Sequence, residues 1–337
     1  MPLRDHLKRF LTLETITLGL LLLLVIGLVI VPSFYLVVGS FTKGNPFSPS
    51  LVLTLSNYQR LVTSERLFPL IGHTFWVSVW TTIFSVVIGS ALAWIITRTD
   101  VPLGGLLSQL IMVPFYFSPF IGGICWSLLA APKVGLINLL LGTLFPSLAG
   151  KVLLNAYTPS GIIWTMTLYF APFVFLFTSG AVSSMDPSLE ESSQTAGANN
   201  AQTALKITLP LVLPAISGGA LLVFILAVGQ FGVPAILGIP GKYYVLTTEM
   251  YQLLSEFPPD YPLVAAFGIL LFGMSSFLVP SGKGAQEEAV HHRDWEGVSA
   301  PEDLDGEMAD GAVFPLRILC FCLRCFAGGG SPVGFTH

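Results

Sequence analysis

Residues 67–97 read LFPLIGHTFWVSVWTTIFSVVIGSALAWIIT, and no Asp, Glu, Lys or Arg interrupts them. A helix needs about 20 mostly apolar residues to cross the hydrocarbon core of a bilayer, so this stretch is long enough to span. It lacks the strict apolar–polar alternation of a membrane β-strand. Because the bilayer core offers no water to backbone groups, we expect a helix here.

Five more charge-free windows follow the same pattern, and together they predict an all-α fold: a polytopic membrane helix bundle with about six transmembrane helices. The composition agrees, since 53% of the 337 residues are hydrophobic and 10% are charged, whereas soluble domains carry roughly 25% charged residues. We expect the membrane domain to cover residues 1–280, with helical cores at about 18–38, 74–96, 110–131, 161–182, 213–232 and 262–279.

A further charge-free stretch, residues 134–150, is too short to span comfortably and contains Pro146. We predict that it forms an interfacial or re-entrant segment on a connecting loop. Several prolines also lie inside the predicted spans, where they permit kinks and close helix approach. Examples are Pro114, Pro119, Pro172 and Pro234.

Ionisable residues are nearly absent from the predicted spans, which argues against several classes of protein. A proton-driven carrier or a membrane enzyme would need clustered carboxylates, nucleophiles or metal ligands at membrane depth. His73 stands alone and is interpreted as an interfacial histidine. The chain has no Gly-x4-Gly-Lys-Ser/Thr loop, so ATP must be bound by a partner, and it has no basic stripe for nucleic acid. We predict no catalytic residue, no metal site and no cofactor.

The basic residues do not fix the orientation in the membrane. With six spans, both termini lie on one side, and the two sides carry similar numbers of Lys and Arg, so the positive-inside rule does not decide. One side carries Arg4, Lys8, Arg9, Arg98 and Lys206; the other carries Lys43, Arg60, Arg66, Lys133, Lys151 and Lys242.

The most informative polar segment is residues 186–210, DPSLEESSQTAGANNAQTALKITLP. Its residues predict two short helices. Asp186 is a good N-cap for the first helix, and Gly197 breaks that helix. Asn199 can cap a second helix that ends near Lys206, after which Pro210 starts the next span. A compact helical hairpin that projects into water is expected.

This segment resembles the EAA motif of ABC importer permeases, which reads Glu-Ala-Ala, three residues, Gly, nine residues, and Ile-x-Leu-Pro. The matching residues here are Glu191-Ser192-Ser193, Gly197 and Ile207-Thr208-Leu209-Pro210. Both spacings agree, and Ser-Ser replaces Ala-Ala. Serine is nearly as small as alanine, so close helix packing should survive the change.

The resemblance implies that the loop seats in a groove of a separate ATP-binding subunit and is therefore cytoplasmic. Both termini would then be cytoplasmic, in a multi-pass protein of the inner membrane. Glu191 would be the polar anchor, Gly197 the bend, and Ser192 and Ser193 the small residues that permit close approach. The implied coupling residues are Glu190, Glu191, Ser192, Ser193, Gly197, Ile207, Leu209 and Pro210.

The resemblance covers about residues 55–279 and is strongest to the iron(III) branch of these permeases. It rests on Leu55-Ser56-Asn57-Tyr58, Ala93-Trp94, Arg98-Thr99-Asp100-Val101-Pro102, Trp126 and Gly135-Leu136-Ile137-Asn138. Thiamine, polyamine and phosphonate permeases share much of this pattern and remain alternatives, as does a secondary carrier. The expected partners are the ATP-binding subunit, a periplasmic or extracellular substrate-binding protein, membrane lipid and a second permease half, as a homodimer or as a missing second half.

The last segment, residues 281–337, has a different character. It is acidic and irregular, and it ends with a cluster formed by Cys320, Cys322 and Cys325. The cluster lacks the second pair of ligands of a zinc site, so a short membrane-surface segment is the better interpretation. We hypothesise that this tail is not family sequence and reflects a reading-frame change or a truncated gene.

Overall fold

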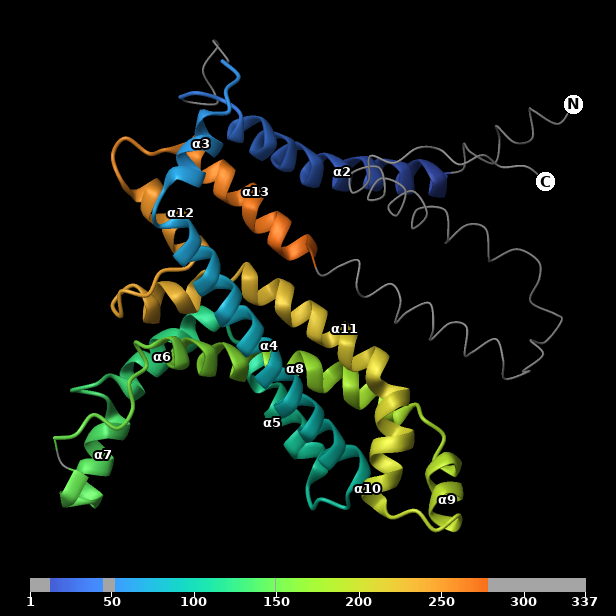
Figure 1. The fold of residues 1–337 in the computed structure, drawn as a ribbon. Helices are drawn as coiled ribbons and strands as arrows, with labels where there is room; N and C mark the ends of the chain where they lie inside the picture. Colours follow the sequence, from blue (N-terminus) through green and yellow to red (C-terminus); the bar gives the residue numbers. More distant parts are fainter. Residues whose placement is uncertain (1–12, 45–51, 149, 278–337) are drawn as a thin grey trace, which may run out of the picture. The chain divides into compact units, whose positions relative to one another are not determined.

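The computed structural model describes residues 13–44, 52–148 and 150–277, and most of these residues lie in helices joined by loops (Figure 1). Within these ranges there is no β-strand, only an isolated bridge between Thr42 and Leu53. The chain divides into two compact units, the second of which runs from Tyr35 to His291. The predicted all-α membrane fold is confirmed.

Four helices of the described chain are long and apolar enough to cross a membrane. They are α2 (Leu13–Ser40), α4 (Leu67–Arg98), α8 (Pro159–Ser183) and α11 (Leu209–Val228), the last extended by the π-helical turn η2 (Ala204–Thr208). A shorter apolar helix, α13 (Tyr261–Phe277), matches the sixth predicted window as far as the described residues reach.

The third predicted span differs from the expectation of one continuous helix. It is divided into α5 (Gly104–Tyr116) and α6 (Pro119–Ala130), which are bent by 98°. The cause is local: Pro119 cannot donate to the preceding turn and forces Ser118 into an extended conformation, at φ −65° and ψ 134°. Ser118 then caps the new helix by accepting from the backbone N–H of Phe120 at 3.3 Å.

The stretch predicted as a short connecting segment contains α7 (Leu136–Leu144) and a 3₁₀ turn, η1 (Pro146–Leu148). One buried side chain, Asn138, fixes its position. Its amide Nδ2 donates to the carbonyl oxygens of Ala131 and Leu154, and its Oδ1 accepts from the N–H groups of Leu153 and Leu154. Four hydrogen bonds from one amide therefore hold α7 between the end of α6 and the chain that leads to α8.

Helix α8 lies at the centre of the main hydrophobic core of the second unit. Its buried residues pack with residues of α4, α6, α11 and the π-helical turn η3 (Pro234–Gly238). The α4–α8 contact is especially close at Gly89, where an added Cβ would lie 2.6 Å from the carbonyl oxygen of Ala171. Small residues let two membrane helices approach in this way.

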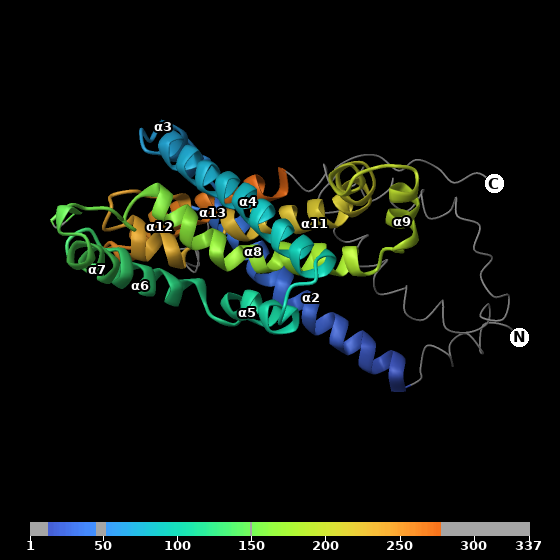
Figure 2. The same ribbon diagram turned by 90° about the horizontal axis from the view of Figure 1, so that it is seen from below.

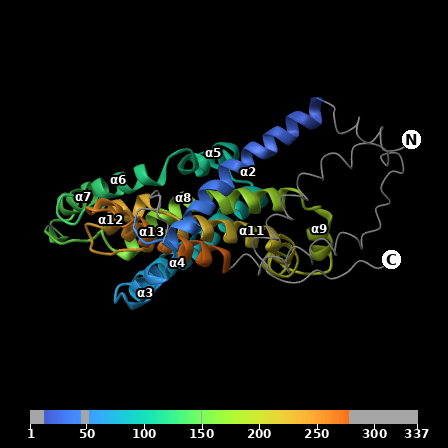
Figure 3. The ribbon, with the colours of Figure 1, turned by 90° about the horizontal axis from the view of Figure 1, so that it is seen from above.

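A second core joins α3 (Ser56–Thr63), the start of α4, α12 (Leu246–Ser255) and α13. At its margin, the Nδ1 atom of His73 lies 2.9 Å from the carbonyl oxygen of Tyr244. In all three ribbon views, α7 lies at one end of the second unit and α9 (Ser188–Thr195) at the other (Figures 1, 2 and 3). The second unit therefore has two separate ends.

Candidate functional site

Helix α9 begins at Ser188, with Pro187 rather than the predicted Asp186 at the N-cap position, but the Asp186 side chain still holds its first residue. The Asp186 carboxylate Oδ1 accepts from the backbone N–H of Ser188 at 2.9 Å. This backbone hydrogen bond, with that of the Ser188 hydroxyl, holds the pKa of the Asp186 carboxyl below its ordinary value. The negative charge also lies at the helix N-terminus, where the helix dipole favours it.

Helix α9 ends at Gly197 through a well-formed helix stop. Gly197 has φ +90°, a left-handed conformation that suits glycine. Its N–H donates to the carbonyl of Gln194 at 2.9 Å, and the N–H of Ala198 donates to the carbonyl of Ser193 at 3.1 Å. These two bonds are those of a Schellman motif. The predicted break at Gly197 is confirmed.

The next helix is capped by Asn199, again as predicted. The Asn199 Oδ1 accepts from the backbone N–H of Gln202 at 2.8 Å, and the Gln202 Oε1 accepts from the N–H of Asn199 at 3.1 Å. This reciprocal pair is a capping box. It starts α10 (Asn200–Thr203).

The prediction that this second helix ends near Lys206 and that Pro210 starts a separate span is wrong. Helix α10 runs through η2 directly into α11. The N–H of Leu209 bonds to the carbonyl of Ala204, five residues earlier, and this wider turn precedes the proline, which cannot donate. The second half of the loop is therefore a rigid extension of a spanning helix.

The structure separates the eight predicted coupling residues into two sets. Glu190, Ser193 and Ile207 are partly buried, and Ser193 shares a 2.9 Å hydrogen bond with Thr203 of α10. Glu191 and Ser192 lie exposed on the other face of α9. Gly197, Leu209 and Pro210 are exposed as well. The exposed set is what a docking partner can reach.

Glu190 is the most strongly held residue of the loop. Its Oε1 accepts from the Arg98 Nε at 3.2 Å and from the Thr208 Oγ1 at 2.7 Å. The side chains of Arg98 and Glu190 are each 17% exposed. Sequence reasoning missed Arg98 and Thr208 as site residues, although the predicted topology places Arg98 on the same side of the membrane as the acidic loop.

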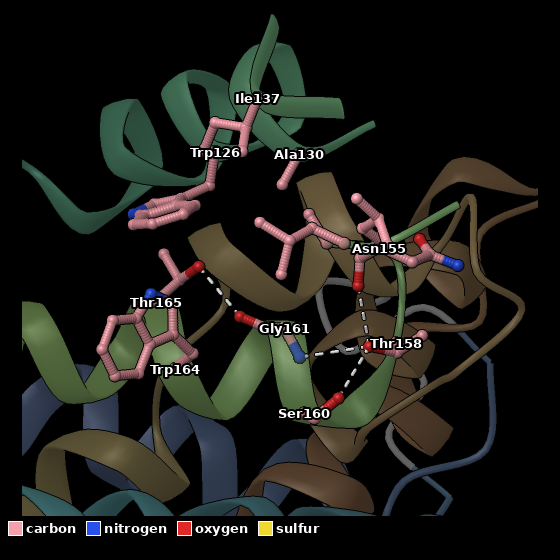
Figure 4. Close-up of a pocket in the computed structure, with 12 residues that line it drawn as sticks. Trp126, Ala130, Ile137, Asn155, Thr158, Ser160, Gly161, Trp164 and Thr165 are labelled. Atoms are coloured by element: carbon pink, nitrogen blue, oxygen red, sulfur yellow. Dashed lines mark hydrogen bonds between the residues drawn. The ribbon is translucent and has the colours of Figure 1, made fainter. Parts of the chain in front are cut away.

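A cavity of about 550 Å³ lies toward the opposite end of the second unit, between α6, α7 and the start of α8 (Figure 4). Trp126 and Trp164 meet edge to face at 6.2 Å along its wall. Its polar amide and hydroxyl side chains come from Asn155, Thr158, Ser160 and Thr165. Carboxylate, imidazole and thiol groups are absent from its lining residues, so these residues do not provide the usual ligands of a metal ion.

Within the described residues, no group of three or more His, Cys, Asp or Glu side chains is arranged to hold a metal ion. The cysteine cluster of the tail and all of residues 281–337 lie outside the described residues.

Comparisons with known proteins agree on one family. The sequence profile described as "Binding-protein-dependent transport system inner membrane component" matches residues 74–281. A protein named as a ferric transport system permease, FbpB 1, of Haemophilus influenzae is 29% identical over 261 residues, covering 77% of this chain and 39% of that protein. The chain thus spans less than half the length of the ferric relatives that it matches.

Two further likenesses differ in coverage. The spermidine/putrescine transport system permease protein PotB of Salmonella typhimurium is 27% identical over 244 residues, covering 72% of this chain and 83% of PotB. Among solved structures, a bacterial ABC transporter involved in the import of the acidic polysaccharide alginate has a chain that aligns with a TM-score of 0.67 and 19% identity, over 86% of this chain and 99% of that chain. The structural likeness supports the fold alone.

Proposed function

This chain belongs to the family of binding-protein-dependent transport system inner membrane components, and from that premise we propose that it is the permease subunit of an ATP-driven importer. Residues 186–210 couple it to a separate ATP-binding subunit. The observation that carries the proposal is the build of this loop. Side chains bond to the backbone at both helix starts, the loop is bent at Gly197 and it is continuous with α11, so a force on the loop reaches a span directly.

The docking surface in this proposal is the exposed face of α9. Glu191 offers a carboxylate to a basic group of the ATPase, and Ser192 leaves room for close backbone approach. Gly197 keeps α9 and α10 adjacent at the tip. Such a surface needs a few well-placed contacts, because a small number of residues supplies most of the binding free energy of an interface.

The coupling role sets the orientation. The loop faces the cytoplasm, and so does the end of α4 that carries Arg98, because the two are joined by an ion pair. With six passes, counting the bent α5–α6 pair and α13 as one pass each, both termini are cytoplasmic. The end that contains α3, α7 and α12 then faces the periplasm, and exposed apolar side chains such as those of Trp76 and Val87 contact lipid.

We propose ferric iron as the transported substrate, supported by the names of the relatives FbpB 1 and FbpB. A periplasmic binding protein supplies the selectivity, in keeping with a cavity whose lining holds no carboxylate. Polyamine is the second candidate, because the match to PotB covers 83% of that protein. A second permease half, either a homodimer partner or a separate chain, completes the passage.

The test is reconstitution in proteoliposomes with the cognate ATPase and binding protein, followed by uptake of ⁵⁵Fe(III) or radiolabelled spermidine. The expected result is uptake of ⁵⁵Fe(III) that requires ATP and the binding protein. Uptake of spermidine instead selects the second candidate. Uptake driven by a proton gradient without ATP would overturn the assignment to an ATP-driven importer.

A further inference from the structure

Arg98, the last residue of α4, occupies a position that joins several elements at the loop end. Its Nε donates to Glu190 of α9 at 3.2 Å, and its Nη2 donates to the carbonyl oxygen of Val182 at 3.2 Å. Val182 lies in the last turn of α8. One guanidinium group, carried at the end of α4, therefore contacts both the loop and the end of α8.

Thr208 completes this arrangement from a fourth element. It is the final residue of η2, is fully buried, and donates its hydroxyl to the same Oε1 atom of Glu190 at 2.7 Å. The Glu190 carboxylate thus receives two donors from residues that are 92 and 18 positions away in the sequence. The loop is tied to both of its flanking spans and to α4.

We propose that Arg98 is a positioning residue that clamps the coupling loop to the ends of α4, α8 and α11, so that these elements move as one body. The inference rests on the proposed function of the loop and adds the means by which loop motion reaches α4, which is not adjacent to the loop in sequence. Without Arg98, the hydrogen bonds that remain between side chains of α9 and those of other parts of the described chain lead to Asn200, Thr203 and Thr208, all on the α10–α11 side of the loop, and none leads to α4.

The geometry of the pair favours arginine over lysine, and its shielding from water makes it sensitive to the loss of either partner. The planar guanidinium presents donors in a fixed fork, so Nε and Nη2 can serve Glu190 and Val182 at once. A lysine has one nitrogen on a flexible stem and cannot reproduce this geometry.

The pair is also largely shielded from water, at 17% exposure for each side chain. Removing either partner leaves the other charge poorly compensated, so single changes should act more strongly than the double change.

The first test measures the clamp without any partner protein. Spin labels are placed at two exposed positions, Asp100 beyond the end of α4 and Thr195 at the end of α9. The background has its four cysteines, Cys125, Cys320, Cys322 and Cys325, replaced by serine. Double electron–electron resonance of the permease in nanodiscs gives the distribution of the label separation. We expect a narrow distribution that broadens in Arg98→Gln and in Thr208→Val.

The matched control is Arg60→Gln, which breaks an ion pair at the other end of the second unit. It should leave the distribution unchanged. Thr208→Ser keeps the hydroxyl and should restore the narrow distribution. Equal widths in the parent chain and in Arg98→Gln would overturn the clamp, whether or not an ATPase binds the loop.

The second test separates positioning from simple stability. In the reconstituted transporter, Arg98→Gln should co-purify with the ATPase as well as the parent chain does, because Glu191 and Ser192 are untouched. The amount of substrate transported per ATP hydrolysed should fall by about tenfold, within the usual range of coupling between two sites. Arg98→Lys should recover only part of this ratio.

The outcomes distinguish the two proposals. An unchanged transport-to-hydrolysis ratio in Arg98→Gln would contradict the clamp while leaving the docking role of the loop intact. A parent chain that fails to bind the ATPase, yet shows the narrow label distribution and its loss in Arg98→Gln, would contradict the proposed function and support the clamp.

Discussion

Arginine–carboxylate pairs lie at both ends of the second unit, and the shortest of them, Arg60–Asp260, is more exposed to water than the pair at the loop. The Arg60–Asp260 pair is short, at 2.6 Å, but the Arg60 side chain is 56% exposed. The Arg98–Glu190 pair is longer, at 3.2 Å, yet both side chains are 17% exposed. Water and ions screen the first pair and screen the second much less.

The partners of each pair extend the contrast. Glu190 also accepts from Thr208, and Arg98 also donates to Val182. Asp260 additionally accepts from the backbone N–H of Leu263, through its other oxygen, at 3.2 Å. Both pairs join residues that are distant in sequence, 92 positions apart for Arg98–Glu190 and 200 positions apart for Arg60–Asp260. The loop pair also engages Thr208 and Val182 of two further elements, whereas Asp260 caps the start of the helix that follows it. We expect the loop pair to carry mechanical coupling and the other pair to contribute little.

The largest predicted effect concerns the close packing of α4 against α8. Gly89→Val would place a side chain where even a Cβ atom lies 2.6 Å from the Ala171 carbonyl oxygen, so α4 and α8 must separate. We expect a loss of about 3 kcal/mol or more, at the upper end of overpacking costs. The measurement is the thermal midpoint in detergent. Gly180→Ala, where an added Cβ meets nothing within 4 Å, is the control. Equal midpoints for the two variants would show that α4 and α8 are not in close contact.

The next effect tests the difference between the Arg98–Glu190 pair and the Arg60–Asp260 pair. Arg98→Gln should destabilise the protein by about 1–2 kcal/mol, because it leaves Glu190 partly buried without its cation. Arg60→Gln should cost less than about 0.5 kcal/mol, as exposed pairs do. Both follow from thermal or denaturant unfolding of the purified chain. If Arg60→Gln proves the more costly, distance rather than shielding governs these pairs.

A smaller effect concerns the bend of the loop. Gly197→Ala places a methyl group on a residue at φ +90°, which should cost about 1 kcal/mol. Gly44→Ala, at φ +83°, is the matched change outside the loop. Both should lower stability similarly, but only Gly197→Ala should reduce the ATPase recovered with the permease. A loss of ATPase with Gly44→Ala as well would mean that general destabilisation explains the result.

The smallest effect is a pH dependence at the start of α9. The folded-state pKa of Asp186 is lowered by its hydrogen bonds to Ser188. Its contribution is therefore complete above the ordinary carboxyl pKa and is lost as the pH falls through the lowered value. Hydrogen exchange of the α9 amides should be faster in Asp186→Asn than in the parent chain at neutral pH, and the difference should shrink under acid conditions. If the difference in exchange rate between the two chains grows in acid, the charged form of Asp186 does not stabilise α9.

The parts of the loop that sequence could predict are those set by neighbouring residues. Asp186, Gly197 and Asn199 each act within four positions along the chain, through caps and a left-handed turn. Which of the two glutamates faces the protein interior is harder to predict. Glu190 and Glu191 look equivalent in the sequence, and only the approach of Arg98 from another helix decides which of them is held inside.

Two features of the spans escaped prediction for different reasons. Pro114 and Pro119 indicate a kink, but the 98° bend between α5 and α6 also depends on how α6 packs against η3 and α8. The continuity of α10 with α11 rests on the π turn of η2, and the capping rules place a helix end near Pro210 instead. Local residues thus indicate where each irregularity lies, but they do not give the size of the bend or the continuity of α10 with α11.

In the proposed importer, the exposed face of α9 binds the ATP-binding subunit. The most direct measurement is the amount of ATPase that co-purifies with the double variant Glu191→Arg/Ser192→Trp, which alters only exposed side chains. We expect the thermal midpoint to be unchanged and the recovered ATPase to fall by at least about tenfold, equal to about 1.4 kcal/mol of binding free energy. Full recovery of the ATPase with this variant would contradict the account.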